Sequence, residues 1–396
     1  MRGDPRRAVI RAGRCLHLAM TAARRWPAPG GDSRPAVTAS CGGLWVGAPT
    51  LVAPLFLYPG LFVSGRFSPR PTRTTVRGGH VGVPAGVPRQ ASVAGRVRDW
   101  VPEGPIDLGL VLGPLRRGPG DPTFRAMPDG SVWRASLTPA GPGTLRVAAA
   151  GGAVRGEAWG PGAEWLLDRL PELLGASDAP EAFVPRHRVV ATARHRRPGL
   201  RLTRTGLVLE SLIPSVLEQK VTTDEAYRAW RLLVRKFGEP APGPAADGRL
   251  WVMPAPRTWA LIPSWEWHRA GVDNKRASTI LRAVRVAARM EEAVRMAPAE
   301  ALARLEVVPG IGPWTSAETV QRSHGAADAV TVGDLHLPGI VGWALAGDRD
   351  ADDSMMLELL EPYAGQRHRA ARLILLSGRV PPRRAPKMPR WDIGGL

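Results

Sequence analysis

The residues best suited to chemistry are an aspartate and a glycine turn that lies about twenty residues before it. Asp334 follows a short extended apolar stretch and immediately precedes an expected helix. In such a position Asp is a favoured N-cap residue. A carboxylate can also stabilise a developing positive charge and orient or deprotonate water. The residue type alone leaves both roles open.

The glycine turn has the sequence Pro309-Gly310-Ile311-Gly312 and lies between two expected helices. Its two glycines permit backbone angles that other residues avoid, and they leave the backbone amides open to close approach. Those amides lie at a helix N-terminus, where the partial positive charge favours a phosphate. A lone Gly-x-Gly would be more typical of an ordinary tight turn. Because a proline precedes it, apolar helices flank it and Thr315 opens the next helix, we interpret it as a phosphate-binding hairpin.

A helical region must hold these residues in place, since apolar residues recur at helical spacing from about Pro198 onward. Thr222 or Thr223 is a suitable N-cap for the second of the expected helices. The expected helices are Leu207–Lys220, Thr222–Phe237, Asn274–Met290, Pro298–Leu305, Trp314–Ser323, Leu335–Leu345 and Arg367–Leu376.

The sequence predicts a mainly α protein with three parts. Residues 1–87 are basic and rich in Pro and Gly, and we expect a disordered N-terminal extension there. Residues 88–185 predict a small α+β subdomain, with strands over Ser131–Leu137 and Thr144–Ala150 and a helix over Pro161–Gly175. Residues 186–396 form the helical region.

The composition favours a polyanionic partner and excludes a metal site built from cysteines in the body of the protein. The chain of 396 residues has a net charge of +19, and arginine-rich chains neutralise phosphates. Residues 1–88 hold twelve Arg against two Asp, so the rest is only moderately basic. Both cysteines, Cys15 and Cys41, lie in that leader, which excludes a cysteine-ligated metal site in the body. We expect a cytoplasmic protein with no membrane span.

The hairpin segment Leu305–Thr315 resembles the helix-hairpin-helix (HhH-GPD) DNA glycosylases, and within them it is most similar to bacterial 3-methyladenine DNA glycosylase II. The resemblance implies that Val308, Gly310, Gly312 and Thr315 line a contact with the DNA backbone. It also implies a monovalent cation at the turn carbonyls of Val308 and Gly310. Asp334 matches the second aspartate of the family's Asp-Asp pair, and Gly333 replaces the first.

The resemblance implies a monofunctional DNA glycosylase that flips a damaged base out of double-stranded DNA and hydrolyses its glycosidic bond in base excision repair. Asp334 would be the catalytic residue and alkylated purines the expected lesions. Bifunctional members carry a lysine just after the hairpin, where this chain has Trp314, so we expect no lyase activity. We expect a monomer that needs no cofactor.

Further residues are assigned by the same resemblance. Lys275 and Arg276 lie at the start of an expected helix. The two cations could contact phosphate, or they could simply be exposed to solvent at the end of the helix. Lys220 stands where the family has an apolar wedge, and it could fill the gap left by the base, bind phosphate or face solvent. The residues expected to form the base pocket or wedge are Trp314, Glu218, Gln219, Lys220 and Tyr227.

Two other readings of the sequence stay open. The enzyme could remove another lesion, such as uracil or mispaired adenine. The chain could also be a non-catalytic DNA-binding module, although such a hairpin does not need a carboxylate at position 334. No His, Cys and carboxylate residues cluster at ligand spacing, so the sequence predicts no catalytic metal.

Overall fold

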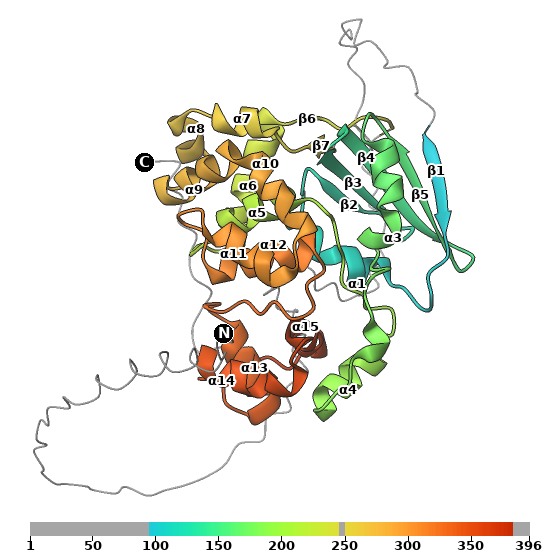
Figure 1. Ribbon diagram of the computed structural model, residues 1–396, viewed down its shortest axis with the longest axis vertical. Helices are drawn as coiled ribbons and strands as arrows, with labels where there is room; N and C mark the ends of the chain where they lie inside the picture. The colour runs from blue at the N-terminus through green and yellow to red at the C-terminus, as the bar shows by residue number, and fades with distance from the viewer. Residues whose placement is uncertain (1–94, 245–249, 383–396) are drawn as a thin grey trace, which may run out of the picture. The chain divides into compact units, whose positions relative to one another are not determined.

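A computed structural model describes residues 95–244 and 250–382 (Figure 1), all within one unit of the chain, Pro54–Leu396. The extension expected over residues 1–87 lies outside the described residues. Within the described ranges, no helix is long and apolar enough to cross a membrane. These residues are organised around three main hydrophobic cores, one containing a sheet and two built from helices.

The first core lies under a five-stranded antiparallel sheet. Its strands are β1 (Arg96–Trp100), β2 (Phe124–Ala126), β3 (Val132–Thr138), β4 (Gly141–Ala150) and β5 (Ala153–Trp159), in the order β1-β5-β4-β3-β2. Alternate residues of a strand face one side, and pairs such as Leu145 opposite Ala158 are buried. The short helices α1 (Leu108–Leu112), α2 (Ala163–Asp168) and α3 (Leu170–Leu173) contribute to this core. The α+β composition predicted for this region is confirmed.

The second core is built from eight helices. They are α5 (Val208–Leu217), α6 (Thr223–Phe237), α7 (Pro256–Ala260), α8 (Ser264–Arg269), α9 (Asn274–Arg285), α10 (Ala287–Glu292), α11 (Pro298–Glu306) and α12 (Pro313–Ser323). A two-stranded sheet of β6 (Glu239–Pro240) and β7 (Trp251–Val252) follows α6. Helices α5 and α12 pack against each other, and both are buried along most of their length.

The predicted start of α6 is confirmed by its capping. The Thr222 hydroxyl accepts a hydrogen bond from the Glu225 amide, and the Glu225 carboxylate accepts one from the Thr222 amide. This reciprocal capping box satisfies two donors that a helix N-terminus would otherwise leave unpaired. It fixes the point at which the chain leaves the loop after α5.

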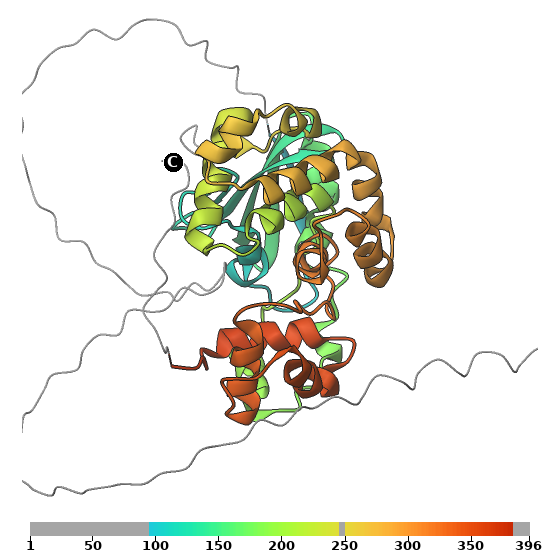
Figure 2. The ribbon, with the colours of Figure 1, turned by 90° about the vertical axis from the view of Figure 1, so that its left-hand side faces the viewer.

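The third core joins one helix from the middle of the chain to the last three. Helix α4 (Arg188–His195) packs with α13 (Leu337–Ala346), α14 (Asp353–Leu360) and α15 (Arg367–Ser377), as Figures 1 and 2 show. The Tyr363 hydroxyl accepts hydrogen bonds from the amides of Arg186 and His187, which ties the two segments together. Four short 3₁₀ turns, Gly113–Leu115, Pro180–Ala182, Ala293–Arg295 and Glu361–Tyr363, complete the described elements.

Four expectations about helices need correction. The helix expected over Pro161–Gly175 is divided at Arg169 into α2 and α3. The helix expected over Asn274–Met290 breaks at Val286, so α9 and α10 are separate. The helix expected from Leu335 begins at Leu337. The sequence does not predict helices α1, α4, α7, α8 and α14, because they are short or are stabilised by packing against residues far away in sequence.

The break between α9 and α10 places Glu291 at the start of α5. Its carboxylate accepts hydrogen bonds of 2.8 Å each from the amides of Val208 and Leu209. The first amides of a helix have no partner within the helix, and the start of α5 is buried. Burial raises the pKa of the Glu291 carboxyl.

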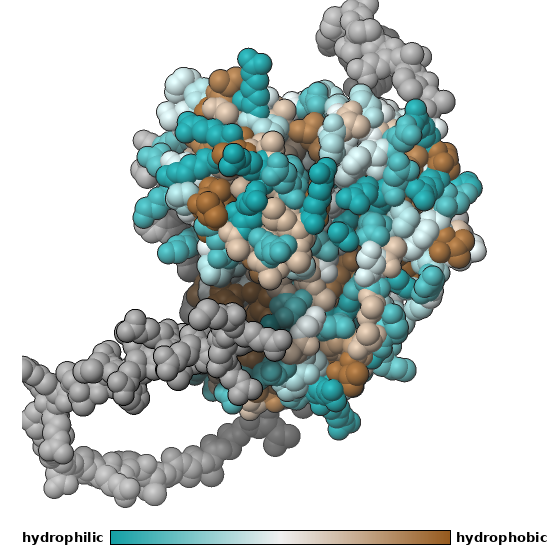
Figure 3. Space-filling model, viewed as in Figure 1, coloured by the Kyte–Doolittle hydropathy of each residue, from teal (hydrophilic) through white to brown (hydrophobic). Residues whose placement is uncertain are grey.

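The visible face of the molecule in Figure 3 carries mostly hydrophilic side chains, with apolar ones in scattered places. The most exposed large apolar residues are Leu335, at 83%, and Val307, at 76%. These two residues adjoin Asp334 and the hairpin turn, so large apolar side chains border the candidate site.

We expect the change Glu291→Ala to lower the free energy of unfolding by about 2 kcal/mol, because two buried amides lose their acceptor. Chemical denaturation measures this. The matched control is Glu292→Ala, which removes an exposed carboxylate lying 3.6 Å from Arg304 and should change stability by less than about 0.5 kcal/mol. Equal effects of the two changes would contradict the proposed capping role.

Candidate functional site

The glycine turn predicted from the sequence joins α11 to α12. Gly310 has a φ of +99°, and a Cβ at this position would lie 2.1 Å from the Thr279 hydroxyl of α9. Any other residue would therefore be strained and would also collide with α9. Val308 and Ile311 are buried on either side and hold the turn against the second core.

The carbonyl groups of this turn face protein donors. Gln219 donates from Nε2 to the Gly310 carbonyl at 3.0 Å and to the Thr315 hydroxyl at 2.7 Å. Arg282 donates to the Pro309 carbonyl at 3.0 Å. Gln219, expected in the pocket or wedge, is thus part of the support for the hairpin. Thr315 is buried and receives that bond.

Two amide groups of the turn differ from its carbonyls in their partners. Within the described residues, neither the Gly310 nor the Gly312 amide donates a hydrogen bond to the protein. A Cβ at Gly312 would meet no atom within 4 Å, so the approach to this backbone is open. These amides stand at the N-terminus of an eleven-residue helix, which favours an anion such as phosphate.

The turn carbonyls fit a monovalent cation only through their second lone pairs. The Val308 carbonyl accepts a hydrogen bond from the Ile311 amide, and the Gly310 carbonyl accepts one from Gln219. A carbonyl oxygen has two lone pairs, so each retains one for a cation. The cation expected at this turn therefore fits beside the hydrogen bonds that the two carbonyls already accept.

Asp334 is half-buried beside the first turn of α12. Its Oδ2 accepts a hydrogen bond of 2.9 Å from the indole Nε1 of Trp314. Its Oδ1 accepts bonds of 2.8 Å from the amides of His336 and Leu337, at the start of α13. Asp334 thus binds the first amides at the start of α13, although the N-cap residue is His336 and not Asp334 as expected. Three N–H donors fix the carboxylate next to the hairpin.

A second carboxylate, which sequence reasoning missed, holds the same loop. Gly333 has a φ of +83°, and its amide donates to Oδ2 of Asp353 at 2.9 Å. Asp353 lies at the start of α14, and its Oδ1 is buried without a hydrogen-bond partner among the described residues. The backbone of Gly333 is thus held by a carboxylate from another helix.

The exposed lysine of the α5–α6 loop is strained. Lys220 has a φ of 54°, the one positive φ of a non-glycine residue among those described. Residues in this conformation cost energy and cluster at functional sites. Lys220 is also solvent-exposed, next to the Gln219 that grips the hairpin.

The two cations at the start of α9 have different surroundings. Lys275 is exposed and remains suited to contact phosphate. Arg276 is 4% exposed, and its guanidinium donates to the Leu217 and Gly271 carbonyls and to the Asp273 carboxylate. The structure therefore places Arg276 in a role that joins α9 to the end of α5, which does not fit its expected contact with DNA.

Glu218 and Tyr227, both expected near the base pocket, lie in a buried polar region. Glu218 pairs with Arg117 at 2.9 Å. The Tyr227 hydroxyl is buried without a hydrogen-bond partner among the described residues. A Cβ on Gly118 would lie 2.1 Å from the Tyr227 ring, so the loop after the first 3₁₀ turn packs tightly on it.

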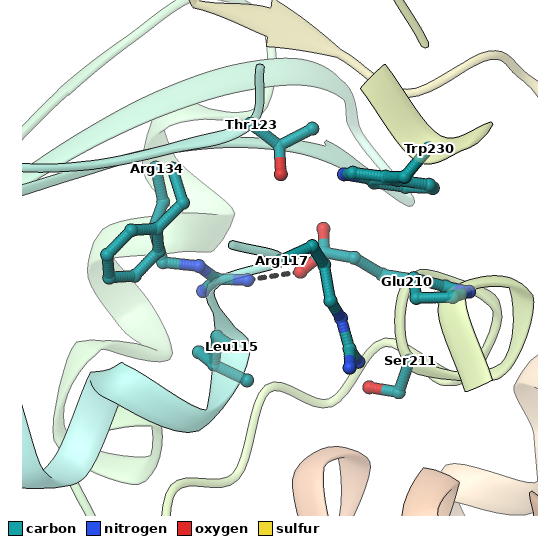
Figure 4. A pocket seen from close by; sticks show the side chains of 9 residues that line it. Leu115, Arg117, Thr123, Arg134, Glu210, Ser211 and Trp230 are labelled. Carbon is teal, nitrogen blue, oxygen red and sulfur yellow. Dashed lines mark hydrogen bonds and ion pairs between the residues drawn. The ribbon is translucent and has the colours of Figure 1, made fainter. Parts of the chain in front are cut away.

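A small cavity lies on the sheet side of α5 (Figure 4). Arg134 and Glu210 form an ion pair across it, and Arg117 and Trp230 also line it. Its volume is about 20 Å³, which is room for about one water molecule. This cavity is too small for a nucleobase and does not serve as a base pocket in this form.

Comparison with solved structures finds this fold in DNA-bound proteins and DNA glycosylases. MBOgg1 with a low-affinity DNA ligand matches with a TM-score of 0.58 and 15% identity, over 72% of this chain and 99% of that chain. The 8-oxoguanine glycosylase/lyase of Clostridium acetobutylicum, in complex with double-stranded DNA containing cytosine opposite 8-oxoG, gives 0.56 and 12%, over 70% and 92%. The 3-methyladenine DNA-glycosylase of Archaeoglobus fulgidus gives 0.57 and 17%, over 71% and 97%.

At identities of 12% to 17%, this likeness concerns the fold. The chain has the fold of helix-hairpin-helix DNA glycosylases, so the mainly α fold expected from the sequence is confirmed. No protein-family model matches the chain, and no curated protein matches its sequence.

We expect Asp353→Ala to loosen the loop before α13, because the Gly333 amide loses its acceptor. Hydrogen exchange of peptides that cover residues 330–336 should become faster. Glu358→Ala, an exposed carboxylate on the same helix, should leave this exchange unchanged. Unaltered exchange in the Asp353 variant would remove Asp353 from the support of the loop.

Proposed function

We propose that this protein is a DNA glycosylase that hydrolyses the bond between a damaged base and its sugar, with Asp334 as the catalytic carboxylate. One observation carries the proposal: Trp314, in the first turn after the hairpin, binds the Asp334 carboxylate at 2.9 Å. A phosphate held by the hairpin amides would thus bring a neighbouring sugar close to a fixed negative charge. The fold shared with DNA glycosylases supports this assignment.

The proposed reaction follows from this charge. As the bond from C1′ of the sugar to the base nitrogen breaks, its electron pair leaves with the base and the sugar gains positive charge. The Asp334 carboxylate stabilises that charge without rearrangement, because its hydrogen bonds hold it in place. Water then adds its oxygen to C1′. One proton of that water is released by way of the carboxylate. A cationic alkylated base leaves as the neutral purine, whereas a neutral base takes up a proton from solvent as it departs.

The proposal includes base removal without strand cleavage. Lyase chemistry needs an amine that attacks C1′ and forms a Schiff base. At the place where bifunctional relatives carry lysine this chain has Trp314, whose indole is bonded to Asp334. Of the other lysines, Lys236 is paired with Glu266 at 2.6 Å, and Lys387 lies outside the described residues.

The proposed partner is double-stranded DNA with a damaged base, bound by one copy of the chain. Gly310, Gly312 and Lys275 would bind the backbone, with Val308 and Thr315 supporting the turn. Lys220 would enter the duplex or bind phosphate beside the lesion. Resemblance in sequence favours a cationic alkylated purine as the lesion.

We expect Asp334→Asn to lower single-turnover base release by at least about 100-fold, a size typical for loss of an electrostatic stabiliser. Affinity for the same lesion-containing duplex should stay within a few-fold. Equal rates for the two proteins would remove Asp334 from the mechanism. Strong DNA binding without release from any lesion would favour a binding module.

Wild-type protein should yield abasic DNA that breaks only after hot alkali. Borohydride should trap no covalent complex, because no lysine stands at the lyase position. A trapped complex or a nicked strand at neutral pH would contradict the monofunctional assignment. A known bifunctional glycosylase assayed in parallel is the positive control.

We expect Lys220→Gly to stabilise the fold by about 1 kcal/mol, because glycine adopts a positive φ without strain. The same change should weaken binding to lesion-containing DNA at least about tenfold. Lys220→Ala retains the strain and should weaken binding equally without gaining stability. If both variants bind DNA as the wild type does, the Lys220 side chain has no part in recognition.

A further inference from the structure

The side of α9 that lies against the hairpin turn carries Lys275, Thr279 and Arg282. These residues are spaced four and then three positions apart, so they share one side of the helix. A Cβ at Gly310 would lie 2.1 Å from the Thr279 hydroxyl, and Arg282 donates to the Pro309 carbonyl at 3.0 Å. Arg282 is therefore held directly beside the turn whose amides are open to an anion.

Arg282 keeps most of its hydrogen-bonding capacity for a ligand. A guanidinium has five N–H donors, and the bond to Pro309 is the one bond that Arg282 makes among the described residues. The side chain is exposed to solvent, and within the same described ranges no carboxylate forms an ion pair with it. The guanidinium is thus fixed at one nitrogen and available at the others.

The peptide group between Pro309 and Gly310 sets where Arg282 stands relative to a bound phosphate. The carbonyl of this group binds Arg282, and its N–H is the Gly310 amide, which bonds to no described residue. In a trans peptide the C=O and the N–H point in opposite directions. Arg282 therefore lies across the peptide group from a phosphate on the amide, where the neighbouring phosphate of the same strand would follow.

The charges along α9 favour an anion beside the turn. The stretch from Asn274 to Met290 contains five cationic residues and no carboxylate. Asp273, just before α9, pairs with Arg276 at 2.6 Å. Glu306 is the carboxylate nearest to the turn in sequence, and it accepts a hydrogen bond of 2.6 Å from Ser316 of α12. Helix α9 thus adds positive charge next to the turn, which is the sign that a phosphate requires.

Support of the turn does not by itself account for an arginine at this place. Arg282 and Pro309 are both exposed, so water could bond to the Pro309 carbonyl equally well. Gln219 has a different setting, because it bonds to the buried Thr315 hydroxyl as well as to the turn. The bond to Pro309 does hold the guanidinium in place before DNA arrives, which reduces the entropy lost when it binds a ligand.

We propose that Arg282 is a further DNA-backbone residue, which binds the phosphate next to the one held by the amides of Gly310 and Gly312. This inference rests on the proposed function, in which the hairpin binds double-stranded DNA. Seven positions separate Lys275 from Arg282, which is about 10 Å along α9, so the two cations would contact different phosphates. Arg282 would thus supply the second phosphate contact that the sequence assigned to the buried Arg276.

The test measures the affinity of the full-length protein for a duplex with a stable abasic-site analogue over a series of salt concentrations. Each phosphate contact adds about one to the steepness with which log K falls as log salt rises. We expect Arg282→Gln to weaken binding at least about threefold at low salt and to reduce that steepness by about one. Since phosphate contacts carry no sequence information, the loss should be equal for duplexes of different sequence.

Three further variants separate a phosphate contact from support of the turn. Arg282→Lys retains the charge and should retain the salt dependence of the wild type. Gln219→Ala removes a neutral support of the same turn, so it should weaken binding without changing the salt dependence. Arg257→Gln removes an exposed arginine of α7, which lies well away from α11 and α12 in Figure 1, and it should leave both quantities unchanged.

The outcomes for Arg282 and for the glycosylase function are distinct. Wild-type affinity and salt dependence in Arg282→Gln would overturn the phosphate contact and leave the glycosylase function standing. Weaker binding with an unchanged salt dependence would give Arg282 only a part in supporting the turn and would also overturn the proposal. If the wild type releases no base while Arg282→Gln still shows the reduced salt dependence, the glycosylase function falls and the phosphate contact stands.

Discussion

The hydrogen bond between the Trp314 indole and the Asp334 carboxylate is the contact on which the candidate site depends. Trp314 opens α12, which belongs to the second core, whereas Asp334 leads into α13 of the third core. Each partner is fixed independently, Trp314 by the helix after the hairpin and Asp334 by two amides of α13. The bond therefore sets the position of the carboxylate relative to the glycine turn, which neither core could set alone.

Helix α12 can serve as a fixed reference because its polar side chains are satisfied inside the protein. Every residue from Thr315 to Ser323 is buried, and a buried polar group without a partner is costly. Thr319 donates to the Thr315 carbonyl, Ser323 donates to the Thr319 carbonyl, and Ser316 donates to Glu306 of α11. These bonds leave the helix little freedom to rotate or slide, so the hairpin at its start is held firmly.

Local signals in the sequence predict the parts of the fold that depend on local physics. The capping box at Thr222, the turn at Gly310 and the strands β3 and β4 all follow from residue types within a few positions of one another. Contacts between residues far apart in the sequence are not predicted by such local signals. Helix α4 completes its burial against helices more than a hundred residues later. Arg276 looked like an exposed cation, yet Leu217, in a distant helix, accepts its bond.

The loop that carries Asp334 depends on a hydrogen bond to a helix further along the chain. At position 333 the backbone has a φ of +83°, which a side chain with a Cβ adopts only with strain. Glycine relieves that strain, and Asp353 supplies a carboxylate to the same loop from the start of α14, twenty residues later. The Gly333 amide needs a hydrogen-bond acceptor, and a carboxylate on any neighbouring segment could provide it. Residue types around position 334 therefore predict the carboxylate itself but not the helix that holds its loop.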